Sequence, residues 1–197
     1  MPPRILAFAG SARRESLNKK LARAAARYAT EAGAEATFVD LDDYPIPLYH
    51  GDLEAASGMP ANAVKLREMF IAHDALLIVS PEHNSSMTSL LKNTIDWLSR
   101  DVGDGKGAAA GLAPWRGKVA GLMAASPGGF GGIRALPHLR QVLSALGVTV
   151  LGTQVAVPNA HEIFASDGSI ADERVARSVR ALAVALADAA GKLSNPR

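Results

Sequence analysis

Three short segments of the chain carry residue types that bind phosphorylated or heterocyclic ligands. The first runs from Gly10 to Asn18 after an apolar stretch and holds hydrogen-bonding side chains beside two arginines. A helix that begins here presents unpaired N–H groups and the positive end of its dipole, which attract an anion. An arginine can then neutralise a phosphate through a charge-assisted hydrogen bond. The segment favours a phosphate site, although an ordinary turn capped by Ser16 has the same spacing. The candidate residues are Ser11, Arg13 or Arg14, Ser16 and Asn18.

The glycine content of this segment excludes two common nucleotide loops. Gly10 is its only glycine, and no Lys-Ser or Lys-Thr pair follows a second one. The segment is therefore neither a nucleoside triphosphatase loop nor the Gly-x-Gly-x-x-Gly fingerprint of dinucleotide-binding folds.

The second and third segments suit the edge and the face of a flat ring. The second, Pro81-Glu82-His83-Asn84, has side chains and backbone groups that hydrogen-bond to a heterocycle. The third contains Ser126, Gly128, Gly129 and Gly131, whose small size lets the backbone approach a ring closely. A ring between these segments, tethered by a phosphate at the first, describes a flavin mononucleotide site. The alternative is that the prolines and glycines only mark loops.

Five apolar runs that alternate with helical segments must position these loops. Strands are expected at 4–9, 35–40, 74–80, 118–126 and 148–157. Helices are expected at 17–32, 61–72, 88–99, through Leu136 to Leu146, and at 170–190 with Ser169 and Asp172 as caps. Long loops are expected at 41–60 and 101–117. Strict alternation predicts an α/β fold, a doubly wound parallel sheet with helices on both faces, whose ligand lies at the carboxyl ends of the strands.

Composition places limits on the chemistry. The 197 residues predict one domain over 1–197, and 48% hydrophobic content rules out a disordered chain. The absence of cysteine removes thiol redox chemistry and cysteine-based metal sites, so electron transfer requires a bound cofactor. We predict no metal, because Ala165 stands where a second histidine would complete the His161 pattern. A net charge of +2 gives no reason to expect nucleic acid. No apolar run is long enough to span a membrane, so we expect a cytoplasmic protein.

Three motifs, in order, resemble the NAD(P)H-dependent FMN reductase family, a flavodoxin-like group that includes chromate and quinone reductases. They are Gly10-Ser11-x-Arg13-x-x-Ser16-x-Asn18, Pro81-Glu82-His83-Asn84, and Leu91-Lys92-Asn93-x-Ile95-Asp96-Trp97-x-Ser99-Arg100. The glycine loop and the segment from Arg134 to Gly147 are similar too, so the resemblance spans residues 4 to about 155. It implies a five-stranded parallel sheet in the order 2-1-3-4-5.

The resemblance also implies roles for the three segments. Ser11, Arg13, Ser16 and Asn18 would hold the FMN phosphate; Pro81, Glu82, His83 and Asn84 would line the isoalloxazine ring; Ser126, Gly128, Gly129 and Gly131 would close its other side. Family members form homodimers or tetramers, which places Arg100 near an interface and the nicotinamide nucleotide. NAD(P)H would reduce the flavin and leave before a quinone, flavin, azo compound or metal oxyanion is reduced. A flavin-binding shuttle or sensor that docks on a protein partner remains the alternative.

The chain departs from the family pattern at three places. His83 occupies a position usually filled by tyrosine and introduces a side chain type that exchanges protons near neutral pH. Thr88-Ser89 replaces the usual Pro-Gly, and the 101–117 loop is longer than usual. These differences affect the choice of acceptor more than the binding of flavin.

Overall fold

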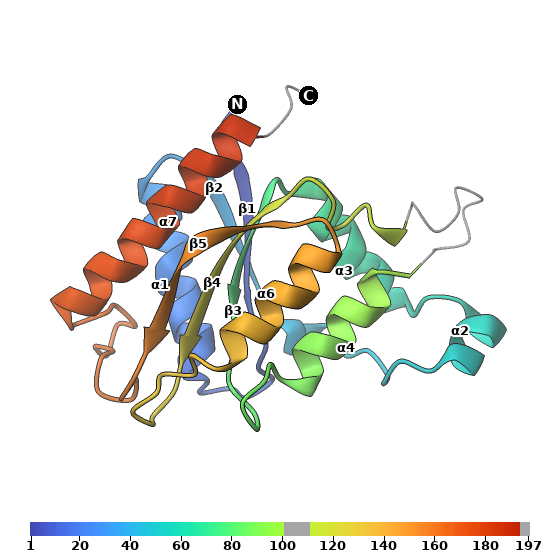
Figure 1. Cartoon of the computed structure of the whole chain (residues 1–197), viewed down its shortest axis with the longest axis horizontal. Coiled ribbons are helices and arrows are strands. Elements are labelled where there is room, and N and C mark those ends of the chain that lie inside the picture. Colours follow the sequence, from blue (N-terminus) through green and yellow to red (C-terminus); the bar gives the residue numbers. More distant parts are fainter. Residues whose placement is uncertain (101–110, 194–197) are drawn as a thin grey trace.

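Strands and helices alternate along the chain in the computed structural model, which describes residues 1–100 and 111–193 (Figure 1). The strands are β1 (Arg4–Ala9), β2 (Glu35–Val39), β3 (Ala75–Val79), β4 (Val119–Ala125) and β5 (Thr149–Val157). The longer helices are α1 (Leu17–Glu31), α3 (Ala61–Ala72), α4 (Ser89–Leu98), α6 (Ala135–Ala145) and α7 (Glu173–Leu193). Each predicted strand is present, with ends that differ from the prediction by at most one residue.

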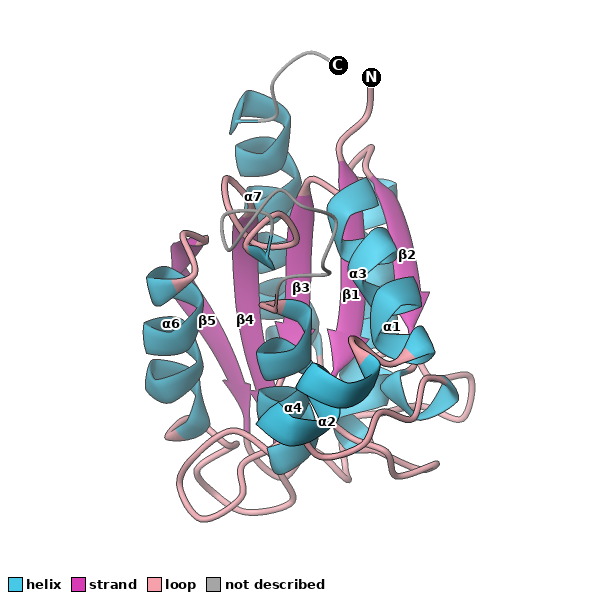
Figure 2. Cartoon of the chain, turned by 90° about the vertical axis from the view of Figure 1, so that its right-hand side faces the viewer, coloured by secondary structure: helices cyan, strands magenta, loops and turns pink. Residues whose placement is uncertain are grey.

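The five strands form one parallel sheet in the order β2-β1-β3-β4-β5. The predicted doubly wound sheet and its strand order are therefore confirmed. The chain leaves β1 toward β2 on one side and later returns to β3 on the other side of β1 (Figure 2). This change of direction leaves a crevice at the carboxyl ends of β1 and β3, where open α/β sheets bind ligands.

Alternating side chains of the buried strands divide the core into two layers. Ile5 and Leu77 pack under α1 and α7, whereas Leu6 and Ile78 pack under α3, α4 and α6. Such near-continuous apolar strands are typical of parallel sheets covered on both faces. Helices therefore cover both faces of the sheet, and its carboxyl edge remains for the loops.

The helix ends follow the capping residues of the sequence, with one correction. Ser16 caps α1 as predicted, and its Oγ accepts a hydrogen bond from the Lys19 N–H. The last helix begins at Glu173 and not near residue 170, because Asp172 is its cap and accepts from the Val175 N–H. Ser169 instead bonds Asp167 in the preceding turn. The predicted start of this helix was wrong because Ser169 and Asp172, three positions apart, can both cap a helix.

The segment 41–60, predicted as a loop with at most short turns, contains a helix. A 3-10 turn (Leu41–Asp43) precedes α2 (Gly51–Ser57), which His50 caps and which buries none of its residues. The segment is held to α4 by side chains: Asn93 bonds the backbone of Tyr49 and Pro47, and the Trp97 indole N–H donates to the Pro47 carbonyl. The prediction failed because a two-turn helix without a buried face has no hydrophobic period to detect.

Two further expectations concern the loop 101–117 and membranes. Residues 101–110 of the predicted loop lie outside the described residues, and Trp115 in the remainder is buried between Phe70 and the Leu98 carbonyl. Among the described residues, no helix has the length and the apolar character needed to cross a bilayer.

Candidate cofactor site

A cleft of about 420 Å³ opens at the carboxyl edge of the sheet, between the loops that follow β1, β3 and β4. Its volume lies within the roughly 300–1,000 Å³ of small-molecule sites. Several residues predicted from the sequence line it together with Gly10, Thr88 and Ala125. The predicted residues in the lining are Ser11, Arg13, Ser16, Asn18, Pro81, Glu82, His83 and Ser126. The three segments, spread over more than a hundred residues of sequence, therefore meet at one place.

The first loop brings the N-terminus of α1 to the cleft. Leu17 and Asn18 are the first two helical residues, and their N–H groups have no carbonyl four residues earlier within the helix. Ser11 is nearly buried, and its Oγ accepts from the Arg13 N–H at 3.3 Å, which holds the loop in its turn. The Arg13 side chain is exposed on the cleft lining. Unpaired amides and a guanidinium at one end of a cleft form an anion site.

Gly10 lets the first loop pass close against α4. A Cβ built on Gly10 would lie 2.9 Å from the Leu91 Cβ and 3.1 Å from the Thr88 Oγ1. The buried Thr88 hydroxyl donates to the Gly10 carbonyl at 2.7 Å and accepts from the Leu91 N–H, so it also caps α4. Thr88, predicted from the sequence to begin a helix and to depart from the family pattern, thus joins the first two loops. Its position before a helix was the signal that could have revealed it.

Asn18 joins the first loop to the third. Its Nδ2 donates to the Ala125 carbonyl at 2.8 Å, and its Oδ1 accepts from the Ala125 N–H at 2.9 Å. The side chain is buried and thereby pairs both backbone groups of the last β4 residue. Asn18 lies in the cleft as predicted, but its carboxamide is committed to the scaffold through both heavy atoms.

Glu82 joins the second loop to the third. One carboxylate oxygen accepts from the Arg134 Nε at 2.7 Å and pairs with its Nη2, and the other accepts from the Arg134 N–H at 3.0 Å. The Arg134 side-chain hydrogen bond lowers the pKa of Glu82, partly offset by burial, so the carboxylate is ionised and paired. Sequence reasoning did not include Arg134 among the site residues.

The second loop ends in a tight turn at His83. The His83 and Ser86 backbones exchange hydrogen bonds of 2.9 and 3.0 Å, while Asn84 and Ser85 have φ values of 50° and 65°. These features define a type I′ turn, which asparagine tolerates better than most residues. His83 and Asn84 are exposed, and His83 lines the cleft.

The glycines of the third loop allow particular backbone conformations and close contacts, and they do not line the cleft. Gly131 has φ +62°, and a Cβ there would lie 2.8 Å from backbone atoms of Val157 and Pro158. Gly128 and Gly129 are exposed, and the Gly128 N–H donates to the Ser126 Oγ. Within the described part of the chain, the lining of the cleft includes Ser126 and Pro127 but none of these three glycines.

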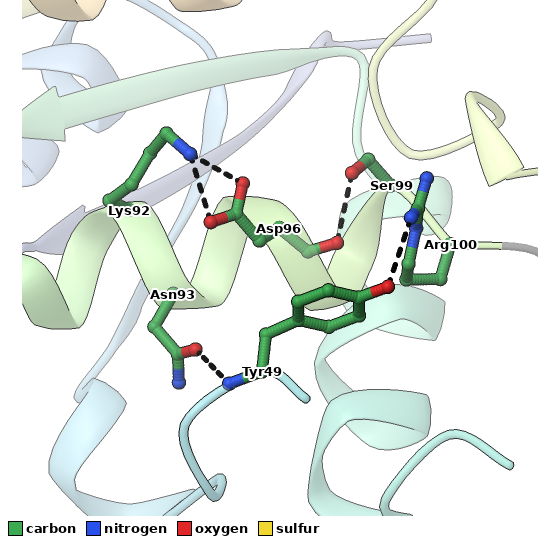
Figure 3. Close-up of polar contacts among 6 residues, drawn as sticks. All are labelled: Tyr49, Lys92, Asn93, Asp96, Ser99 and Arg100. Carbon is green, nitrogen blue, oxygen red and sulfur yellow. Dashed lines mark hydrogen bonds and ion pairs between the residues drawn. The ribbon is translucent and has the colours of Figure 1, made fainter. Parts of the chain in front are cut away.

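Arg100 lies at the other end of α4 from the cleft. Its Nη1 donates to the Tyr49 hydroxyl at 3.2 Å (Figure 3). That hydroxyl in turn donates to Glu54. The Tyr49 hydrogen bond raises the pKa of Arg100. Since α4 spans ten residues, about 15 Å of helix separates Arg100 from the cleft of its own chain.

The residues at the cleft fit a mononucleotide. The loop after β1 supplies a helix N-terminus and Arg13, and the loops after β3 and β4 supply Pro81, Glu82, His83, Ser126 and Pro127. The acidic residue of the lining, Glu82, is neutralised by Arg134 and does not oppose a phosphate. A mononucleotide cleft at the switch point of a five-stranded parallel sheet defines a flavodoxin-like protein.

Comparisons with known proteins agree with this class. The sequence pattern of the family described as NADPH-dependent FMN reductase matches residues 3–162, so the chain belongs to that family. It is an enzyme of this family, with FMN as its cofactor and a reduced nicotinamide nucleotide as its co-substrate. The resemblance stated from the motifs is confirmed.

Relatives match over most of their length. An NAD(P)H-dependent FMN reductase of Pseudomonas aeruginosa is 36% identical over 173 residues, which cover 87% of this chain and 86% of the relative. An NAD(P)H:quinone oxidoreductase of Solanum tuberosum is 33% identical over 195 residues, 96% of this chain and 94% of the relative. Among solved structures, the flavoenzyme NAD(P)H:(acceptor) oxidoreductase FerB of Paracoccus denitrificans has a TM-score of 0.81 and 29% identity, with 97% of this chain and 98% of that chain covered.

Proposed function

We propose that this enzyme transfers electrons from NAD(P)H through FMN to a quinone-type small molecule, with the cleft at the carboxyl edge as the FMN site. The observation that carries the proposal is the meeting of the α1 N-terminus, Arg13 and the two later loops around one cleft of mononucleotide size. The names of the Solanum tuberosum relative and of a Burkholderia 2-hydroxy-1,4-benzoquinone reductase, 35% identical over 151 residues, support a quinone as acceptor.

In this proposal the chain supplies position and charge. FMN, when bound, would supply the redox chemistry between the nicotinamide nucleotide and the acceptor. The phosphate is held by the backbone N–H groups of Leu17 and Asn18, by the region of Ser11 and Ser16, and by Arg13. In the same proposal Pro81, Glu82, His83 and Asn84 border the ring, and the loop of Ser126, Gly128, Gly129 and Gly131 closes its other side. The lining of the cleft contains Pro81, Glu82, His83 and Ser126 of these residues. No side-chain acid or base is required.

The bonds between the loops preorganise this arrangement before FMN binds. Thr88 with Gly10, Asn18 with Ala125, and Glu82 with Arg134 each tie one loop to another. A site whose loops are already connected loses less conformational entropy when it closes on a ligand. We propose that NAD(P)H and the acceptor occupy the same open side of the cleft in turn, which requires a ping-pong mechanism.

Two further elements of the proposal concern the assembly. The apolar layers on both sides of the sheet share the same five strands, which supports one functional domain over the whole chain. Because Arg100 lies about 15 Å of helix from its own cleft, a role near the nicotinamide requires the cleft of a second copy. We therefore propose a homodimer or tetramer, which sedimentation equilibrium tests directly.

An anaerobic titration of the FMN-loaded protein with NADPH and NADH tests the function. We expect the flavin absorbance to bleach with about one equivalent of reductant and to return when 2-methyl-1,4-naphthoquinone is added. Initial rates at several fixed acceptor concentrations should give parallel double-reciprocal lines. A flavin that stays oxidised, or a reduced protein that does not pass electrons to any quinone, contradicts the proposal and favours a shuttle or sensor.

A further inference from the structure

A second depression adjoins the cofactor cleft, between the first turn of α4 and the middle of α6. This α4–α6 groove has a volume of about 820 Å³. Both helices lie on the same face of the sheet (Figure 1). His83, Thr88 and Ser89 line both the groove and the cleft, so the two form one continuous depression.

The groove combines an apolar floor with polar and basic edges. Met87 and Val142 are half-buried against the core and offer apolar surface to a flat ring. His83, Lys92 and His138 stand at the edges, and within the described residues the lining contains no carboxylate. Asp96, outside the lining, pairs with Lys92: both of its oxygens accept from the Lys92 ammonium, at 2.7 and 2.9 Å.

His138 is held in a defined position in the groove. Its Nδ1 lies 2.9 Å from the Ser86 Oγ, which joins α6 to the turn after β3. When the Ser86 hydroxyl donates to Nδ1, the Nε2 carries the ring hydrogen and is a donor. With this tautomer His138 offers a hydrogen-bond donor that suits an anionic group; the contact with Ser86 also allows the reverse tautomer, in which Nδ1 donates to Ser86 and Nε2 is an acceptor.

We propose that the α4–α6 groove binds the substituent end of the electron acceptor and favours flat aromatic acceptors that carry an acidic group, such as a sulfonate or a carboxylate. The inference rests on the proposed function, because the ring of the acceptor must reach the adjoining cleft. The apolar floor receives the ring system, and His138 donates to the acidic group, with His83 and the Asp96-paired Lys92 in the same lining.

Binding to the FMN-loaded, oxidised protein tests the groove without turnover. Naphthalene-2-sulfonate, which cannot be reduced, should bind in calorimetry at low ionic strength, and His138→Gln should weaken its binding about fivefold. Gln141→Glu, which adds a carboxylate to the exposed lining, should weaken it further. His161→Gln is the matched control, because His161 is an exposed histidine outside the groove.

Turnover supplies the second readout. We compare kcat/KM for 1,4-naphthoquinone-2-sulfonate with kcat/KM for 2-methyl-1,4-naphthoquinone. The ratio should fall about fivefold in His138→Gln and stay constant in His161→Gln. The proposal is overturned if the ratio is unchanged in both groove variants or if naphthalene-2-sulfonate does not bind. It is also overturned if the variants change the oligomeric mass and not the selectivity, because a second copy of the chain then covers the groove. If the wild type reduces neither quinone, the proposed function is refuted. The calorimetric binding of naphthalene-2-sulfonate then still tests whether the groove binds an acidic aromatic compound.

Discussion

The two ends of the sheet hold their charged residues in different ways. At the carboxyl end, Arg13 faces open space on the cleft and Glu82 is paired with Arg134 across two loops. At the amino end, Lys118 is buried, its ammonium donates to the His73 carbonyl, and burial lowers its pKa to about 8 despite the opposing effect of Asp74. Burial also lowers the pKa of His73.

The comparison shows that the largest pKa shift does not mark the functional site in this protein. Perturbed titratable groups often gather where side chains act as acids or bases. A site whose redox chemistry belongs to a cofactor needs backbone donors, a helix N-terminus and fixed loops instead. The carboxyl end supplies these features, and the amino end contains a buried amine that carries a desolvation cost.

The largest effect is expected where the carboxyl end depends on backbone fit. Gly131→Ala places a side chain at φ +62° and against the backbone of Val157 and Pro158, so we expect a loss of about 2–4 kcal/mol in the free energy of unfolding. Gly129→Ala is the control, because a Cβ there meets nothing within 4 Å. Urea denaturation measures both; equal losses would contradict the distinction between the two glycines.

At the amino end, Lys118 should make the free energy of unfolding depend on pH. The Lys118 pKa is about 8 in the folded chain and ordinarily 10.5, so between these values the unfolded chain binds more protons and the free energy of unfolding rises with pH. Lys118→Met removes this contribution. Between pH 8 and 10.5 the wild type should therefore gain up to about 3 kcal/mol relative to the variant.

Urea denaturation of the wild type and Lys118→Met at several pH values provides the measurement. Lys65→Met, at an exposed lysine of α3, is the control and should follow the wild type. Parallel pH profiles for the wild type and Lys118→Met would show that the buried amine carries no such penalty.

A smaller effect is expected at the junction of the first and third loops. Asn18→Asp replaces the amide donor with an oxygen opposite the Ala125 carbonyl, so we expect a loss of about 1–3 kcal/mol in the free energy of unfolding. Asn62→Asp is the control, because Asn62 makes a comparable bond to Pro45 at the surface. Thermal denaturation gives the melting temperatures of both variants. Similar melting temperatures would mean that the Asn18 hydrogen bonds do not hold the first and third loops together.

The five strands could be predicted because each strand is a short apolar run with its own local signal, whereas their order was implied only by the family resemblance. β1 and α3 begin and end at the predicted residues. The capping Ser16 of α1 was also readable, since a cap acts within three residues of the chain. By contrast, α2 has no buried face, and two residues competed to cap α7, so local patterns could not decide these elements.

The loops of the site could be predicted, but the bonds between them could not. Thr88 and Gly10 are 78 residues apart, and Asn18 and Ala125 are 107 residues apart. These contacts depend on how the strands are ordered and aligned, which no local spacing encodes. The sequence likewise did not show that Gly131 packs against the end of β5 and not on the cleft.

The affinity of the apoprotein for FMN tests the central claim most directly. Flavin fluorescence quenching gives the Kd for the wild type, for Arg13→Ala, and for Arg14→Ala, whose arginine is exposed but outside the cleft lining. We predict micromolar or tighter binding by the wild type and by Arg14→Ala. Arg13→Ala should lose about 1.5–3 kcal/mol, roughly tenfold to more than a hundredfold in Kd. Equal Kd values for the two variants, or no FMN binding by the wild type, would contradict a phosphate site at the start of α1.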